Sequence, residues 1–264
     1  MNATIKALLL LLAIPFLTYS QKLASKQQLG VWIPGDSKID GKATEWDDKF
    51  QAYNKSIEAF YTIANDDKNL YLIIKATDQL VIRKIIAGSI TFSVSPDEGK
   101  KSKDVVAITY PVFDADNLPK VNLKNQPVPS KDAAVSRLQL DSFMRVANQQ
   151  VVDKSKKIKI TGSAALEDTL VSVYNQQGIK VVSHFDNKIA YTCEWMIPFK
   201  YLGISSNQGK FYYNIKLNGS VRSEGSFIEN IPGGVRVNGP VTMADMQFIS
   251  SATDLSNEYI IAKK

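Results

Sequence analysis

The feature that most constrains the fold of this chain is a polar turn that opens directly into a run of large apolar residues. Asn65 to Asn69 is rich in Asn and Asp, whose side chains bond their own backbone and favour turns. Leu70 to Ile74 consists of branched and aromatic residues, which suit the pleated surface of a buried strand. Ser56 to Ala64 alternates apolar side chains on one face. We therefore predict an antiparallel hairpin that pairs Ser56 to Ala64 with Leu70 to Ala76.

Further short segments along the chain have the alternation or the β-branched content of strands, and turn residues separate them. We predict strands at Ser89 to Ser95, Asp104 to Tyr110, Ile158 to Thr161, Leu170 to Tyr174, Ile179 to His184, Ile189 to Ile197 and Lys210 to Leu217. Asn175 to Gly178 is expected to be a hairpin turn, and Leu80 to Ala87 could be helical. The pattern predicts an all-β fold, an antiparallel β-sandwich of about eight to ten strands, with an up-and-down barrel as the alternative.

One segment, residues 111 to 149, interrupts the β pattern. Prolines at positions 111, 119, 127 and 129 make a continuous strand implausible there. An approximate helical stripe follows from Lys131 to Gln149, with Ser130 as the expected N-cap. We predict a loop-plus-helix insertion, which is also the segment through which a protein partner would dock.

The N-terminus has the three parts of a secretory signal peptide. Lys6 precedes the apolar run Ala7 to Phe16, and small residues lead to an expected cleavage between Ser20 and Gln21. The run is shorter than the roughly 20 apolar residues that span a bilayer, and no later run has that length, so no membrane span is expected after cleavage. The predicted organisation is a signal peptide at 1–20, a polar lead-in at 21–35, a sandwich domain at 36–250 and a C-terminal tail at 251–264. The protein should be secreted or periplasmic.

Charge and cysteine content narrow the function classes. The chain has 32 basic and 26 acidic residues, but its basic cluster at residues 154 to 159 lacks the interleaved aromatic rings of single-strand binders. We therefore expect no nucleic-acid partner. The single cysteine, Cys193, excludes an intramolecular disulfide and is expected to be a buried apolar residue. A catalytic pair with the single histidine, His184, is an alternative.

Four motifs in order resemble the family 9 carbohydrate-binding module and its DOMON-like relatives. They are Ile39-Asp40-Gly41 followed by Trp46, the stretch Ala64 to Leu72, Thr77-Asp78, and Tyr191 to Phe199 with Leu202-Gly203-Ile204. The resemblance implies an immunoglobulin-like β-sandwich that binds sugars and can hold structural calcium. In that family a pair of tryptophans clamps the sugar ring.

Sugar recognition needs flat aromatic faces together with planar polar groups that bond adjacent hydroxyls. The candidate ligand-binding residues are Trp32, Trp46 and Trp195. Trp195 alternates with apolar residues of a predicted strand, and Trp46 is close to a turn, so packing in the core is the competing interpretation for both. Trp32, in the polar lead-in, is the least constrained of the three.

Aspartates on turns supply the hard oxygen ligands that calcium requires. Asp40, Asp66, Asp67 and Asp78 are the candidate calcium ligands, although turn aspartates also cap backbone N–H groups. Asp78 and Glu194 form a conceivable glycosidase pair, which would need the two carboxyls to face one cleft. Haem binding, known among DOMON relatives, would require His184 in the sandwich core.

These observations predict a secreted, non-catalytic protein that binds a glycan or polysaccharide. The alternative is a structural or interaction module that docks through the inserted segment onto an envelope or secreted complex. Haem binding and glycoside hydrolysis are minor alternatives. No cofactor is expected other than structural calcium.

Overall fold

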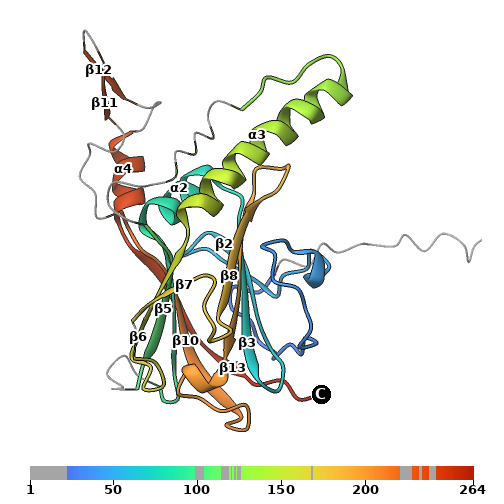
Figure 1. Cartoon of the computed structure of the whole chain (residues 1–264), viewed down its shortest axis with the longest axis vertical. Coiled ribbons are helices and arrows are strands. Elements are labelled where there is room, and N and C mark those ends of the chain that lie inside the picture. The colour runs from blue at the N-terminus through green and yellow to red at the C-terminus, as the bar shows by residue number, and fades with distance from the viewer. Residues whose placement is uncertain are drawn as a thin grey trace, which may run out of the picture.

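Two antiparallel β-sheets pack face to face around a hydrophobic core (Figure 1). The computed structural model describes residues 23–98, 104–113, 119, 121, 123, 126–167, 169–220, 228–231, 234–237 and 242–264. The predicted signal peptide lies outside these residues. Because the two sheets are separate, the predicted antiparallel sandwich is confirmed and the single closed barrel is wrong.

The first sheet has five strands in the order β1-β2-β3-β9-β8. The strands are β1 (Ala52–Asn54), β2 (Ala59–Asn65), β3 (Asn69–Ala76), β8 (Lys180–Phe185) and β9 (Tyr191–Pro198). Strands β2 and β3 form the predicted hairpin, with Asn65 opposite Leu70 and Tyr61 opposite Ile74. The turn chemistry and the two-residue period therefore predicted the hairpin correctly.

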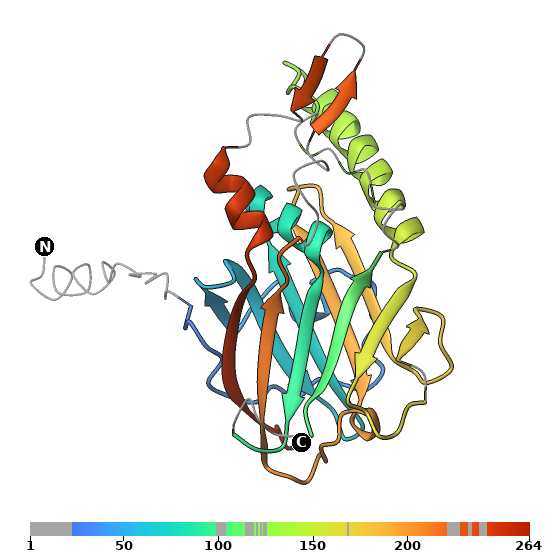
Figure 2. The same ribbon diagram turned by 90° about the vertical axis from the view of Figure 1, so that its left-hand side faces the viewer.

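The second sheet has six strands in the order β13-β10-β4-β5-β6-β7 (Figure 2). The strands are β4 (Ile90–Ser95), β5 (Val106–Val112), β6 (Lys157–Thr161), β7 (Leu170–Ser172), β10 (Lys210–Leu217) and β13 (Thr253–Ile260). A separate two-stranded ribbon pairs β11 (Ile228–Ile231) with β12 (Gly234–Val237). All the predicted strands exist, within a few residues at their ends.

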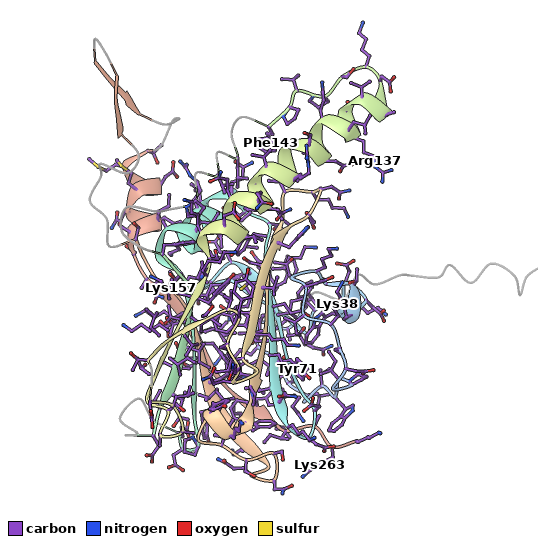
Figure 3. The ribbon with its side chains drawn as sticks, in the orientation of Figure 1. Lys38, Tyr71, Arg137, Phe143, Lys157 and Lys263 are labelled. Atoms are coloured by element: carbon purple, nitrogen blue, oxygen red, sulfur yellow. The ribbon has the colours of Figure 1, made fainter. Side chains whose placement is uncertain are left out.

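Side chains from the facing surfaces of the two sheets fill the core (Figure 3). The Trp195 ring on β9 is fully buried and makes edge contacts with Phe92 and Tyr110 of the opposite sheet, at centroid distances of 6.5 and 6.2 Å. The hydroxyls of Tyr61 and Tyr213 meet across the core at 2.9 Å. Large apolar area and aromatic edge contacts thus join the sheets without any disulfide.

The lead-in packs over the outer face of the five-stranded sheet, so it belongs to the domain and is not a separate segment. The side chain of Gln27 bonds the backbone N–H and C=O of Ile63 at 2.7 and 2.8 Å, as a paired strand would. Ile33 is buried against Tyr71 and Ile73 of β3. The short helical turn η1 (Thr44–Trp46) continues this cover.

Three helices lie at one end of the sandwich (Figures 1 and 2). They are α2 (Gln79–Gly88), α3 (Ala133–Lys154) and α4 (Met243–Ser250), and a second short turn, η3 (Phe199–Tyr201), follows β9. Helix α3 is the predicted insertion helix, although its N-cap is Asp132 and not Ser130. Its outer part extends beyond the sandwich, where Arg137 is labelled in Figure 3. None of the helices in the described part of the chain is both long and apolar enough for a membrane span.

Two predictions about chain connections are wrong. Asn175 to Gly178 does not join a hairpin, because β7 pairs with β6 while β8 pairs with β9 in the other sheet. The segment 251–264 is not a frayed tail, since β13 pairs with all of β10, from Lys210 opposite Ile260 to Leu217 opposite Thr253.

Candidate functional site

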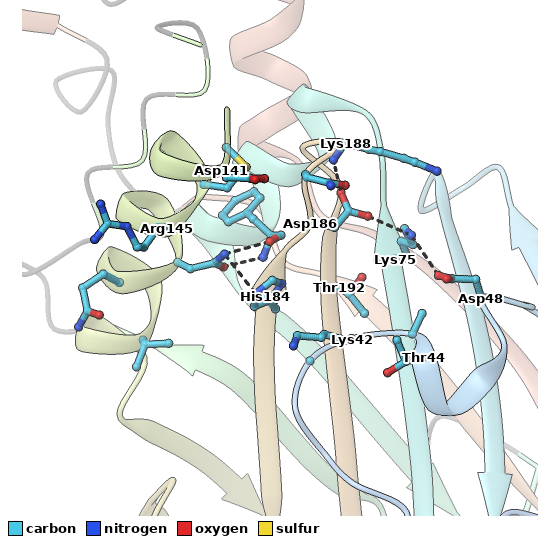
Figure 4. A pocket seen from close by; sticks show the side chains of 18 residues that line it. Lys42, Thr44, Asp48, Lys75, Asp141, Arg145, His184, Asp186, Lys188 and Thr192 are labelled. Atoms are coloured by element: carbon cyan, nitrogen blue, oxygen red, sulfur yellow. Dashed lines mark hydrogen bonds and ion pairs between the residues drawn. The ribbon is translucent and has the colours of Figure 1, made fainter. Parts of the chain in front are cut away.

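A solvent-open groove of about 950 Å³ lies between helix α3, the β8–β9 hairpin and the N-terminal loop around residues 41–48 (Figure 4). We call it the helix groove. Its polar lining comes from four separate parts of the chain: Lys42, Thr44, Asp48, Lys75, Asp141, Arg145, Asn148, Gln149, His184, Asp186, Asn187, Lys188 and Thr192. The volume lies within the range of about 300–1,000 Å³ found for small-molecule sites.

Asn148 fixes one wall of the groove by attaching α3 to β8. Its Oδ1 accepts the backbone N–H of Phe185 at 2.7 Å, and its Nδ2 donates to the Phe185 carbonyl at 2.9 Å. Nδ2 also lies 3.3 Å from Nε2 of His184. Since an amide nitrogen only donates, this contact makes Nε2 the acceptor and assigns the imidazole proton to Nδ1.

Lys75 organises the opposite wall. Its Nζ lies 3.2 Å from the carboxylate of Asp186 and 3.6 Å from that of Asp48. Asp186 also accepts the backbone N–H groups of Lys188 and Ala190, which fixes the tight β8–β9 turn. Both carboxylates are therefore held by Lys75, whose side chain is mostly buried, and Asp186 is held by backbone donors as well.

His184 and Lys42 lie together near the middle of the groove (Figure 4). Burial and the positive charge of Lys42 lower the pKa of His184, against the opposing influence of Asp40 and Asp186. The imidazole is therefore neutral at pH 7. The groove offers the Lys42 ammonium and the neutral His184 imidazole to a ligand, and the exposed side chains of Thr44 and Asn187 add a hydroxyl and an amide.

Trp46 is buried against the outer face of the five-stranded sheet, with 8% of its surface exposed. Its Nε1 donates to Oε1 of Glu194 at 2.8 Å, while Oε2 of Glu194 accepts the backbone N–H groups of Asp40 and Gly41. Burial raises the pKa of Glu194 to about 6, although these three donors oppose the shift. The pair anchors the N-terminal loop beside the groove, so Trp46 is structural and has no free face for a sugar.

Trp195 is also structural, because its ring is fully buried between the sheets and its Nε1 contacts Sγ of Cys193. The predictions that Trp46 and Trp195 bind a ligand are therefore wrong. Trp32 is half-buried and forms an isolated bridge with Asn65, which pins the lead-in to β2. It does not line the helix groove. The structure thus does not bring the three tryptophans together as a clamp.

Three of the four candidate calcium ligands have another role, and the fourth, Asp67, is an exposed side chain. Asp66 accepts four hydrogen bonds within its turn, from Lys68, Asn69 twice and Tyr71. Burial disfavours its charge, but these bonds outweigh burial and hold its pKa below the usual value. Asp78 caps α2, Asp40 pairs with Lys38, and Asp67 is exposed. Across the residues that the structure describes, no cluster of three or more His, Cys, Asp or Glu side chains could hold a metal ion, and the four aspartates do not come together as one set of ligands.

The alternative catalytic and haem roles do not fit the geometry. Glu194 is fully buried while Asp78 is exposed at the start of α2, so they do not face one cleft. Cys193 points into the core, whereas the neighbouring-strand residue His184 lines the groove on the outer side. His184 therefore neither pairs with Cys193 nor lies in the core as a haem ligand would.

Sequence reasoning missed the groove because its residues come from distant segments. One signal was present in α3, where the polar Asn148 interrupts the apolar positions Met144, Ala147 and Val151. A polar amide beside a buried helix face commonly satisfies backbone groups of a neighbouring element. This signal indicates that Asn148 attaches α3 to another element. The element is the end of β8, where Asn148 bonds the backbone of Phe185.

Fold and groove together define a two-sheet β-sandwich with a polar cleft beside an inserted helix. No known protein-family model matches the chain, and no curated protein matches its sequence.

Proposed function

We propose that this protein is a non-catalytic glycan-binding protein that acts outside the cytoplasm and binds its ligand in the helix groove. The observation that carries the proposal is the convergence of Lys42, Thr44, His184 and Asn187 in one open hollow. Amide, imidazole, ammonium and hydroxyl groups are the partners that sugar hydroxyls use. The resemblance to family 9 carbohydrate-binding modules and the signal-peptide pattern support the same assignment.

Binding without catalysis is favoured because two of the three carboxylates of the groove pair with Lys75 and the third lies on exposed helix α3. Asp48 and Asp186 pair with Lys75, and Asp141 lies 3.9 Å from Arg137 on the same helix. A glycosidase needs one carboxyl group that carries a proton to the leaving oxygen. Glu194, the carboxyl with the raised pKa, is buried beneath the N-terminal loop and cannot reach a ligand.

A pair of matched tryptophan substitutions on α3 tests the proposal. Gln149→Trp places a large ring in the groove from an exposed helical position, while Gln139→Trp places it on the same helix outside the groove lining. We expect an oligosaccharide array to identify a ligand for the wild type and for Gln139→Trp, and Gln149→Trp to lose that ligand. Equal binding by both variants would contradict the proposal. So would hydrolysis of the bound glycan, detected as new reducing ends.

A second candidate function, a protein-interaction module, has one specific observation in its favour. Helix α3 leaves Val135, Leu138 and Val146 exposed, with 40%, 70% and 58% of their surfaces in solvent. A photo-crosslinking residue at Leu138 would capture a partner docked on this face. A defined protein adduct together with an empty glycan array would favour this function over glycan binding.

A further inference from the structure

We infer that the helix groove selects an acidic glycan, one whose sugars carry carboxylate groups as uronic acids do. The inference rests on the proposed function and adds the chemical class of the ligand. Three features of the groove support it: the balance of its charges, the absence of an exposed Phe, Tyr or Trp ring among its lining residues, and the contrast with a second hollow on the opposite sheet.

The charge balance of the groove leaves cations in excess. Four basic side chains line it, and Lys75 is the one that neutralises acids, namely Asp48 and Asp186. The third acid, Asp141, lies 3.9 Å from Arg137, which is outside the lining, so the lining itself has four basic side chains against three acidic ones. The remaining cations are therefore available to a ligand.

These available cations are Lys42, Arg145 and Lys188, and they come from three different walls. Lys42 has only a distant carboxylate, Asp40 at 3.8 Å, and that carboxylate already pairs with Lys38 at 2.9 Å. Its ammonium lies beside the neutral His184 (Figure 4). A bound carboxylate would give Lys42 the charge-assisted hydrogen bond that the protein itself supplies only weakly.

No exposed Phe, Tyr or Trp ring is found among the residues that line the groove. Phe185 is the single benzene-type ring in the lining, and it is 1% exposed, packed against Tyr191 at a centroid distance of 5.1 Å. A neutral sugar depends on stacking against such a ring for much of its affinity. An acidic sugar instead carries its own charge, so the groove can bind it through ionic hydrogen bonds.

A second hollow, of about 680 Å³, lies on the outer face of the six-stranded sheet and has the opposite character. The half-buried ring of Tyr212 on β10 lies there, opposite Ser95 of β4 on one side and Glu258 of β13 on the other. Four carboxylates line this hollow against two lysines, Lys26 and Lys216. It would repel an acidic chain and so provides an internal control for the assignment.

Affinity electrophoresis through gels that contain polygalacturonate or neutral amylopectin tests the inference with the full mature chain. The groove variant is Lys42→Ala/Arg145→Ala, and the charge-matched control is Lys159→Ala/Lys216→Ala on the other sheet. We expect polygalacturonate to retard the wild type more than amylopectin does. The groove variant should weaken this binding by about tenfold or more, since it loses charge-assisted bonds, and the control by only about twofold, as for exposed charges.

The outcomes separate the inference from the proposed function. Equal losses in the groove variant and the charge-matched control would show non-specific polyanion binding and overturn the inference. Binding of amylopectin alone, lost in Gln149→Trp, would overturn the acidic class and leave glycan binding in place. If Tyr212→Ala lost polygalacturonate binding while the groove variant kept it, the ligand would bind in the second hollow, and the assignment of the site to the helix groove would be wrong. Retardation by neither polymer, with an empty glycan array, would overturn both proposals.

Discussion

Glu194 is the residue on which the N-terminal loop depends, because a single buried carboxylate accepts donors from three residues of that loop. Its pKa is about 6 in the folded protein against an ordinary 4.5. The folded state therefore binds more protons than the unfolded state between these values, and the free energy of unfolding falls as pH rises through them. At about 1.36 kcal/mol per pKa unit, the decrease amounts to roughly 2 kcal/mol.

Trp46→Phe tests this residue-level account. The substitution keeps most of the buried ring but removes the Nε1 donor from Glu194. At pH 7, where Glu194 is ionised, we expect the free energy of unfolding in urea to decrease by about 1.5–3 kcal/mol, as for a hydrogen bond to a charged group. At pH 4.5 the loss should be smaller, because the carboxyl is then protonated. Trp32→Phe is the control, and a loss independent of pH would contradict the role of Glu194.

At the scale of single residues, the sequence predicted some roles correctly and others not. It indicated that Cys193 is buried and gave core packing as the competing interpretation for Trp195, because both alternate with apolar residues along a strand. It did not show that Glu194 on the same strand accepts bonds from Trp46, because that contact joins residues 148 positions apart. Periodicity reports which face a side chain occupies, while the partner on that face depends on tertiary packing.

Among the elements, α3 has the greatest effect on the groove, since it forms one entire wall. Much of its outer half is exposed, and its buried side chains are Met144, Ala147 and Val151 near its C-terminal end. With so little apolar area buried, the bonds of Asn148 to β8 carry a large share of its attachment. The groove is consequently sensitive to this one side chain.

Asn148→Asp should therefore loosen α3. One carboxylate oxygen would face the carbonyl of Phe185, where the amide now donates, and the contact would become repulsive. We expect a loss of about 1–3 kcal/mol in the free energy of unfolding, the range for a buried polar group left without its partner. Hydrogen exchange should accelerate across Ala133–Lys154. Gln149→Glu, at the adjacent exposed position, is the control, and unchanged protection in Asn148→Asp would contradict this attachment.

The elements were predictable where local chemistry alone determines them. The β2–β3 hairpin follows from its Asn- and Asp-rich turn, and α3 follows from the prolines before it and its helical stripe. Strand β13 was missed because its exposed positions, including Asp254, Ser256 and Glu258, are polar and resemble a tail. An edge strand needs few apolar residues, since one of its neighbours is solvent.

At the scale of the whole molecule, segments near both ends of the described chain are bonded to the β2–β3 hairpin. The side chain of Asn65, at the β2–β3 turn, accepts the hydroxyl of Tyr259 and the backbone N–H of Ala262, both at 2.8 Å. The Tyr259 hydroxyl also contacts the backbone of Val31 in the lead-in. Three segments far apart in sequence thus form one hydrogen-bonded cluster, which sequence patterns could not have indicated.

Truncation after Ser251 tests whether the C-terminal segment is part of the fold. The deletion removes β13 and its buried Leu255, Tyr259 and Ile261, and it exposes the whole edge of β10. Because an uncovered edge and lost apolar packing favour association of sheets, we expect an aggregating protein without a cooperative thermal transition. Truncation after Ala262 retains the Asn65 contacts and should leave the wild-type melting temperature unchanged. A monomeric protein with an unaltered melting temperature after the longer deletion would show that residues 252–264 are a dispensable tail.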